Sequence, residues 1–189
     1  TDDDTGSSAQ AAAIEVVDAA GAMESALNDI QDVIDGGGLD LAAELALYES
    51  LYKITGNPGD DGEGDGDGND ENGALDHLER DNLNATLIKV RQAIQYLEDA
   101  EAIDAAGPVP SGLDMTAAKS QLALTARSIV QGAIDDALVV AVKNSELRKI
   151  ADAEALLADG DAMLAIGDYL ATLDNYTDAV RKVENLINP

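Results

Sequence analysis

The sequence predicts an all-α protein, an up-and-down helical bundle or a set of stacked α-hairpins, interrupted by one long loop that is rich in aspartate and glycine. Three observations support this prediction. Apolar residues recur at alternating three- and four-residue spacing in several segments, which places them on one face of a helix. No segment of useful length shows the alternation typical of a strand. Most connections between the helical segments are short, which favours antiparallel neighbours.

The first half of the chain predicts an α-hairpin over residues 9–54, after a linker or processed N-terminus at residues 1–8. The first helix is expected to open at Ser7, with which Gln10 would form a capping box, and to close at the glycines of residues 36–38. Its apolar positions are Val16, Ala20, Met23, Leu27, Ile30 and Ile34. In the second helix, four apolar side chains share a face before Gly56 and Pro58 end it: Leu41, Leu45, Tyr48 and Tyr52.

The second half predicts a helical bundle over residues 74–189. A helix from about residue 74 to 104 is expected to break near Asn82, and Pro108 and Pro110 then force a turn. The segment 114–143 has the widest apolar stripe, so it should be the central and most buried helix. Two further helices, 145–166 and 168–187, complete the bundle.

The last two helices resemble a single tetratricopeptide-type hairpin over residues 156–183. Gly160 and Ala179 fall where that family has small residues, Tyr176 falls where it has an aromatic one, and residues 167–169 match its inter-helix turn. Such repeats form a peptide groove only when about three are stacked. The resemblance therefore implies a hairpin geometry and no peptide-binding residues.

The composition excludes several classes of function. The net charge is −27, from 38 acidic and 11 basic residues, and the basic residues are scattered, which argues against nucleic acid and against an anionic membrane surface as partners. No apolar run approaches the roughly 18 residues that a membrane-spanning helix needs. The chain contains no Cys, Phe or Trp, so disulfides and thiolate chemistry are excluded and the core must be aliphatic. A start at Thr1 fits a mature exported protein or a fragment of a longer one.

The one segment with a chemical signature is the loop at residues 55–73. Between residues 60 and 72, oxygen-bearing side chains alternate with glycine. Calcium takes six to eight oxygen ligands at about 2.3–2.6 Å, and a short loop supplies them only when ligands recur at every second residue and glycines allow sharp turns. Aspartate also outnumbers glutamate by 26 to 12 over the whole chain. Since aspartate is the poorer helix former, this bias indicates cation binding or a salty medium.

The loop resembles the calcium loops of EF-hands, dockerins and thrombospondin type 3 repeats. A register from Asp61 has asparagine at the twelfth position, and a register from Asp65 has Asp76 there, as in dockerins. The resemblance implies a calcium site, with one ion or two, whose ligands come from Asp61, Glu63, Asp65, Asp67, Asn69, Asp70, Glu71 and Asp76. A flexible acidic linker and a site for another divalent ion are the alternatives.

Other candidate sites are weak. His77 is the only histidine, and we expect it on a helix surface, since a single imidazole builds neither a transition-metal site nor a charge-relay pair. Neighbouring carboxylates such as Asp135 and Asp136, or Glu98 and Glu101, are expected to be solvated faces. Asn84 and Asn175 each begin a glycosylation sequon. The chain has no phosphate-loop, nucleophile-elbow or zinc-protease motif.

These features favour a non-enzymatic, calcium-stabilised structural protein outside the cell or at the cell surface, a subunit or spacer of a filament or surface layer. We expect self-association or binding to other surface proteins, and no small-molecule substrate. The alternatives are a partner-binding helical module attached to a secreted enzyme or polysaccharide-processing machinery, and a cytosolic helical protein of a halophile.

Overall fold

The structure is a computed structural model that describes residues 5–56 and 72–187. Over these residues the chain forms only helices, which confirms the predicted all-α bundle. They are α1 (Thr5–Gly36), α2 (Leu41–Thr55), α3 (Ala74–Glu79), α4 (Leu83–Ala106), α5 (Thr116–Val140), α6 (Asn144–Ala165) and α7 (Tyr169–Ile187).

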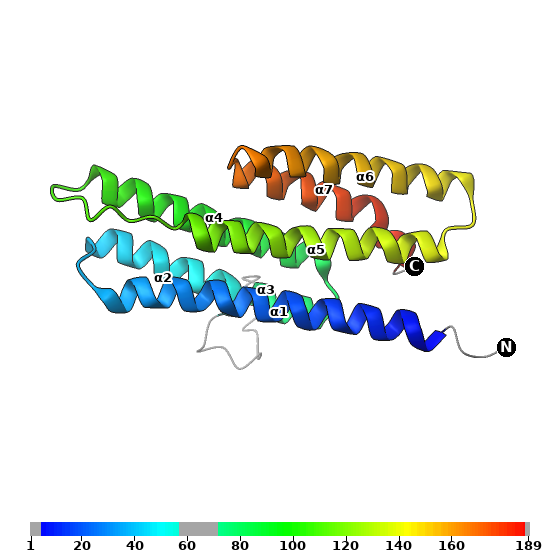
Figure 1. The fold of residues 1–189 in the computed structure, drawn as a ribbon, viewed down its shortest axis with the longest axis horizontal. Helices are drawn as coiled ribbons and strands as arrows, with labels where there is room; N and C mark the ends of the chain where they lie inside the picture. The colour runs from blue at the N-terminus through cyan, green and yellow to red at the C-terminus, as the bar shows by residue number, and fades with distance from the viewer. Residues whose placement is uncertain (1–4, 57–71, 188–189) are drawn as a thin grey trace, which may run out of the picture.

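The long helices lie in three stacked layers, each an antiparallel pair: α1 with α2, α4 with α5, and α6 with α7 (Figure 1). The layers are joined mainly by α2 packing on α4, α1 on α5, and α7 on both α4 and α5. The α1–α2 turn lies at one end of the long axis and the α5–α6 turn at the other (Figure 1). The bundle is therefore elongated, with its helices along one direction.

Helix α5 is the central helix, as its wide apolar stripe predicts. It contacts helices of all three layers, namely α1, α4, α6 and α7. Eleven of its residues are buried, more than in any other helix whose side chains are described throughout: Ala118, Lys119, Leu122, Ala123, Thr125, Ala126, Ile129, Val130, Ala133, Ile134 and Ala137. Most are small or aliphatic, which allows the close helix packing that a core without Phe or Trp needs.

The expected break at Asn82 is confirmed. Helix α3 ends at Glu79, and Asp81 then takes a left-handed conformation with φ 54°. The Asn82 Oδ1 atom accepts a hydrogen bond from the Ala85 N–H at 3.2 Å, which caps α4. The short α3 therefore turns the chain between the loop and the bundle.

The start of α1 differs from the prediction. The helix begins at Thr5, so Ser7 and Gln10 lie inside its first turns and the expected capping box at Ser7 is wrong. Residues 5–8, which we expected to be part of a linker, are helical. Ser and Gln are compatible with a helix interior as well as with its start, so residue type alone could not fix this boundary.

Helix α2 buries a different face from the one its large residues mark. Its buried residues are Ala43, Ala46, Leu47, Ser50 and Ile54. Leu41 is 70% exposed and Leu45 56%, and Tyr52 is also exposed. Alanines at 43 and 46 let α2 approach α4 closely, because a small side chain shortens the distance between helix axes. Helix α2 therefore has two apolar faces, and the bulkier one points to solvent.

The α6–α7 hairpin has the turn that the sequence predicts. Gly167 has φ 78°, a conformation that favours glycine, and the Asp168 Oδ1 atom accepts from the Ala171 N–H at 3.1 Å. Further along the pair, a Cβ atom on Gly160 would lie 2.4 Å from Cε1 of Tyr176. The buried tyrosine ring thus lies directly on the glycine backbone.

Candidate metal site

The two ends of the Asp/Gly-rich loop are held together by backbone contact. A Cβ atom on Gly73 would lie 2.2 Å from the Gly56 N atom, 2.4 Å from the Ile54 O atom and 2.5 Å from the Thr55 C atom. Only a glycine permits this approach. The chain therefore leaves the bundle at Gly56 and re-enters it at Gly73 at almost the same point.

The local structure explains why a glycine stands at each end of the loop. Gly56 ends α2 with φ 83°, and its N–H donates to the Tyr52 carbonyl at 2.9 Å. Gly73 has φ −83° and ψ 177°, a backbone conformation that any residue can adopt. Glycine is therefore needed here for lack of space for a side chain and not for its backbone conformation. The role of Gly73 does not stand out in the sequence because this residue is one of many glycines in that region. Its position immediately before the next helix was the signal that could have identified it.

Asp76 is the one predicted ligand that the structure describes. It lies in the first turn of α3 and is half-buried. Its Oδ2 atom accepts a hydrogen bond from the Gly73 N–H at 3.0 Å, so the carboxylate stabilises the end of the loop. The other carboxylate oxygen, Oδ1, makes no hydrogen bond to a described residue. Asp76 is the residue at the twelfth position of the dockerin-like register.

The other predicted ligands, namely Asp61, Glu63, Asp65, Asp67, Asn69, Asp70 and Glu71, lie outside the described residues. Within residues 5–56 and 72–187, no three His, Cys, Asp or Glu side chains are grouped so that they could hold a metal ion. A calcium site in this protein would thus depend on the 57–71 segment, with Asp76 as the contribution from the folded bundle.

His77 is buried, with only 5% of its surface exposed, so the expectation of a surface position is wrong. It follows Asp76 in the short α3, which packs against α1, α2 and α4. Three surrounding helices leave little of so short a helix open to solvent. The spacing of apolar residues cannot predict that His77 is buried, because α3 is less than two turns long.

Several carboxylates outside the loop have structural tasks. Asp104, near the end of α4, accepts hydrogen bonds from the Ser111, Gly112 and Leu113 N–H groups, each at 3.0 Å, and from the Ser111 hydroxyl at 2.7 Å. These bonds, led by the Ser111 N–H, lower the pKa of Asp104 from 3.8 to about 2. The carboxylate fixes the α4–α5 connection.

Glu101, which we expected together with Glu98 to form a solvated face, is instead in an ion pair with the buried Lys119. Glu101 accepts from the buried Lys119 Nζ at 2.6 Å and from the Met115 N–H at 2.6 Å, which joins α4 to α5. Lys119 Nζ also lies 5.6 Å from the ring centroid of Tyr169. Burial raises the pKa of Glu98, and Lys119 opposes that shift. This arrangement ties α4, α5 and α7 together.

A second polar cluster joins α5 to the α6–α7 hairpin. Arg127 donates to both carboxylate oxygens of Asp161, at 2.8 and 2.9 Å, and the Tyr176 hydroxyl donates to the same carboxylate at 2.6 Å. Burial and the Asp161 charge raise the pKa of Tyr176. A bidentate pair of this kind fixes geometry as well as charge.

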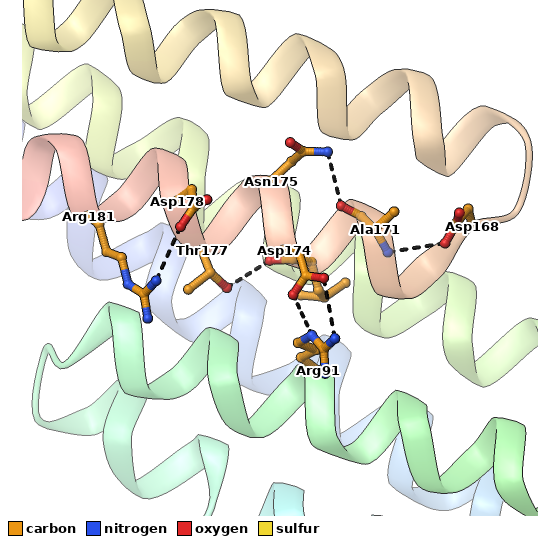
Figure 2. A network of polar contacts seen from close by, with 9 residues as sticks. Arg91, Asp168, Ala171, Asp174, Asn175, Thr177, Asp178 and Arg181 are labelled. Atoms are coloured by element: carbon orange, nitrogen blue, oxygen red, sulfur yellow. Dashed lines mark hydrogen bonds and ion pairs between the residues drawn. The ribbon is translucent and has the colours of Figure 1, made fainter.

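Helix α7 is joined to α4 by a further set of polar contacts (Figure 2). Arg91 on α4 points at Asp174 on α7, with Nε 2.5 Å from Oδ1. Arg181 donates to Asp178 at 3.2 Å and to the Asn84 Oδ1 atom at 3.1 Å. The side chains of Arg91, Lys119, Arg127 and Arg181 thus make polar contacts between helices.

The two sequon asparagines lie inside helices and not in loops. The Asn175 Nδ2 atom donates to the Ala171 carbonyl at 3.0 Å, and the sequon threonine Thr177 is buried and donates to Leu173 (Figure 2). In the other sequon, Thr86 is fully buried. Acceptor sequons usually lie in surface loops, so the folded structure disfavours glycosylation at both positions.

Within the described residues, no helix is both long and apolar enough to cross a bilayer. Comparisons with protein-family models, curated proteins and solved structures find no match.

Proposed function

We propose that this chain is a non-enzymatic structural protein, stabilised by calcium in its Asp/Gly-rich loop, that acts outside the cell or at the cell surface. In this role it is a subunit or spacer of a larger assembly such as a filament or a surface layer. The observation that carries the proposal is the contact between Gly73 and the backbone of residues 54–56.

That contact matters because of the charge between the two ends. Residues 57–71 contain seven carboxylates and no basic residue. Clamping both ends keeps these charges close to one another, so their mutual repulsion opposes closure of the loop. A divalent cation ligated by alternate side chains would remove that repulsion and supply the ligand set that the sequence spacing favours.

The surroundings of the loop support a stabilising role. Asp76 and Gly73 connect the loop directly to α3, and α3 packs on α1, α2 and α4. An ion bound in the loop would thus reinforce the junction between the first layer of the bundle and the second. Extracellular calcium modules bind at about 10⁻⁴ to 10⁻³ M, which suits a millimolar extracellular concentration.

The expected size of the effect follows from mass action. At a calcium concentration 100 times Kd, a site present only in the folded state stabilises it by about 2.7 kcal/mol. For a chain of this size each kcal/mol moves Tm by roughly 2–4 °C, so the expected rise is about 5–11 °C.

The test is a calorimetric Tm and a particle size measured by light scattering, each in calcium and in EDTA. A triple variant, Asp61→Asn with Asp65→Asn and Asp67→Asn, should lose the calcium-dependent rise in Tm. The matched control removes the same charge from exposed positions on the helices: Asp32→Asn with Asp152→Asn and Asp159→Asn. It should keep the rise. If calcium changes neither Tm nor size in the unmodified chain, the proposal is wrong.

A further inference from the structure

The α5–α6 turn differs from the rest of this acidic molecule. We define the basic tip as the exposed residues Val139, Val142, Lys143, Leu147, Arg148 and Lys149. Residues 143–149 include three of the 11 basic residues and carry a net charge of +2 in a chain whose total is −27. Val139 is 75% exposed and Val142 84%. The tip therefore combines apolar surface with positive charge.

The structure leaves this positive charge available. The only acid in the stretch, Glu146, accepts hydrogen bonds from the Val142 and Lys143 N–H groups and pairs with Lys143 Nζ, all at 3.0 Å. No described carboxylate pairs with Arg148 or Lys149. These two cations, unlike Arg91 or Arg127, hold no helices together.

The complementary surface lies on α2. We define the acidic stripe as Leu41, Glu44, Leu45, Tyr48, Glu49 and Tyr52. Its apolar members recur at i, i+4, i+7 and i+11, so they form one ridge about 17 Å long on the side of α2 opposite its buried residues. Leu41, Leu45 and Tyr52 are exposed, and Tyr48 is partly buried against the core. Glu44 and Glu49 flank the ridge on either side. The stripe is thus apolar like the tip, but carries the opposite charge.

The positions of the two surfaces determine what kind of oligomer their contact would form. The tip lies at the end of the long axis where α5 meets α6, and the stripe begins at the other end, where α1 meets α2 (Figure 1). The two surfaces of one molecule therefore cannot meet. When the tip of one copy meets the stripe of another, each copy keeps a free surface, so the contact repeats.

We infer that copies of this chain associate head to tail, with the basic tip of one copy docked on the acidic stripe of the next. This rests on the proposed assembly role and names the partner, a second copy of the chain. Two copies that meet by their acidic faces repel each other. The tip matches an acidic apolar ridge in both charge and polarity.

The test measures mass by sedimentation equilibrium at increasing protein concentration. The tip variant combines Val142→Glu, Arg148→Glu and Lys149→Glu. The stripe variant combines Leu41→Gln, Leu45→Gln and Tyr52→Gln. All six positions are exposed, so both variants should keep the circular dichroism of the unmodified chain. The unmodified chain should grow beyond a dimer, and each variant alone should stay a monomer.

The decisive sample is an equimolar mixture of the two variants. The tip variant keeps an intact stripe and the stripe variant an intact tip, so the mixture should form 1:1 dimers and nothing larger. A matched control, Val109→Gln with Ile166→Gln, changes exposed apolar residues outside both surfaces and should grow like the unmodified chain.

Three different results would contradict head-to-tail association. A mixture that stays monomeric excludes a head-to-tail contact, and oligomers that both variants still form show assembly through another surface. An unmodified chain that stays monomeric but sediments with phosphatidylglycerol vesicles through its tip would make the tip a membrane contact. Each of these results overturns head-to-tail association but leaves the effect of calcium on Tm unchanged. The inference can therefore fail while the proposed calcium-stabilised role still stands.

Discussion

Replacing Gly73 by alanine tests the clamp at the base of the loop. The added Cβ atom would lie 2.2–2.5 Å from three backbone atoms of residues 54–56. Ordinary carbon contacts are about 3.5–4.0 Å. A backbone atom cannot rotate away as a side chain can, so the two ends of the loop must separate. Because Gly73 has a φ of −83°, alanine brings no backbone strain of its own.

The cost should lie at the upper end of the range for overpacking, about 3 kcal/mol. That predicts a fall in Tm of about 6–12 °C by calorimetry. The matched control is Gly21→Ala on the exposed side of α1, where a Cβ atom meets nothing within 4 Å. Alanine is the better helix former by about 1 kcal/mol, so Tm should hold or rise there. Equal Tm values for the two variants would refute the clamp.

Three further predictions concern the bundle. Gly160→Ala pushes a Cβ atom against the buried Tyr176 ring and should lower the unfolding free energy in urea by up to about 2 kcal/mol, the overpacking cost less the gain in helix propensity; an increase would contradict the packing. Tyr176→Phe removes the hydroxyl bond to Asp161 and should cost about 1.5 kcal/mol in the same assay, since Asp161 is charged but partly exposed; no change would show that the bond contributes nothing. The lowered pKa of Asp104, about 2 against 3.8, means that its stabilisation is present above pH 4 and is lost as pH falls towards 2. Asp104→Asn should therefore flatten the dependence of Tm on pH between 4 and 2, and an unchanged slope would count against the hydrogen bonds to Ser111.

Long helices with a strong apolar period could be predicted from the sequence. In α4, four apolar residues that recur at helical spacing, Leu87, Val90, Ile94 and Leu97, are fully buried, and a fifth, Leu83 at the start of the helix, is partly buried. In α5, the width of the apolar stripe correctly indicated the central position. These predictions succeed because a long helix averages its pattern over several turns, so only one face can be buried.

The choice of face in α2 could not be predicted in the same way. Its large residues mark one side, yet Ala43 and Ala46 allow the opposite side to approach α4 closely. The period of apolar residues identifies a helix face. It does not show whether a face of large side chains or a face of small ones that allows close helix packing will be buried. The burial of His77 has a similar origin, since it depends on helices that are distant in sequence.

The candidate site shows the same division. Its residue types and spacing were visible in the sequence, whereas the clamp between Gly73 and Gly56 depends on two helix ends meeting in space. Asp76 was predicted as a ligand, and the structure gives it a hydrogen bond to the Gly73 N–H. Calcium binding itself stays a prediction.

The most direct measurement is an anomalous difference map, recorded at long wavelength from crystals grown in millimolar calcium. We expect a peak between residues 60 and 72, within about 2.3–2.6 Å of several carboxylate oxygens. A map without a peak there, from crystals in which the loop is ordered, would contradict a loop held by calcium.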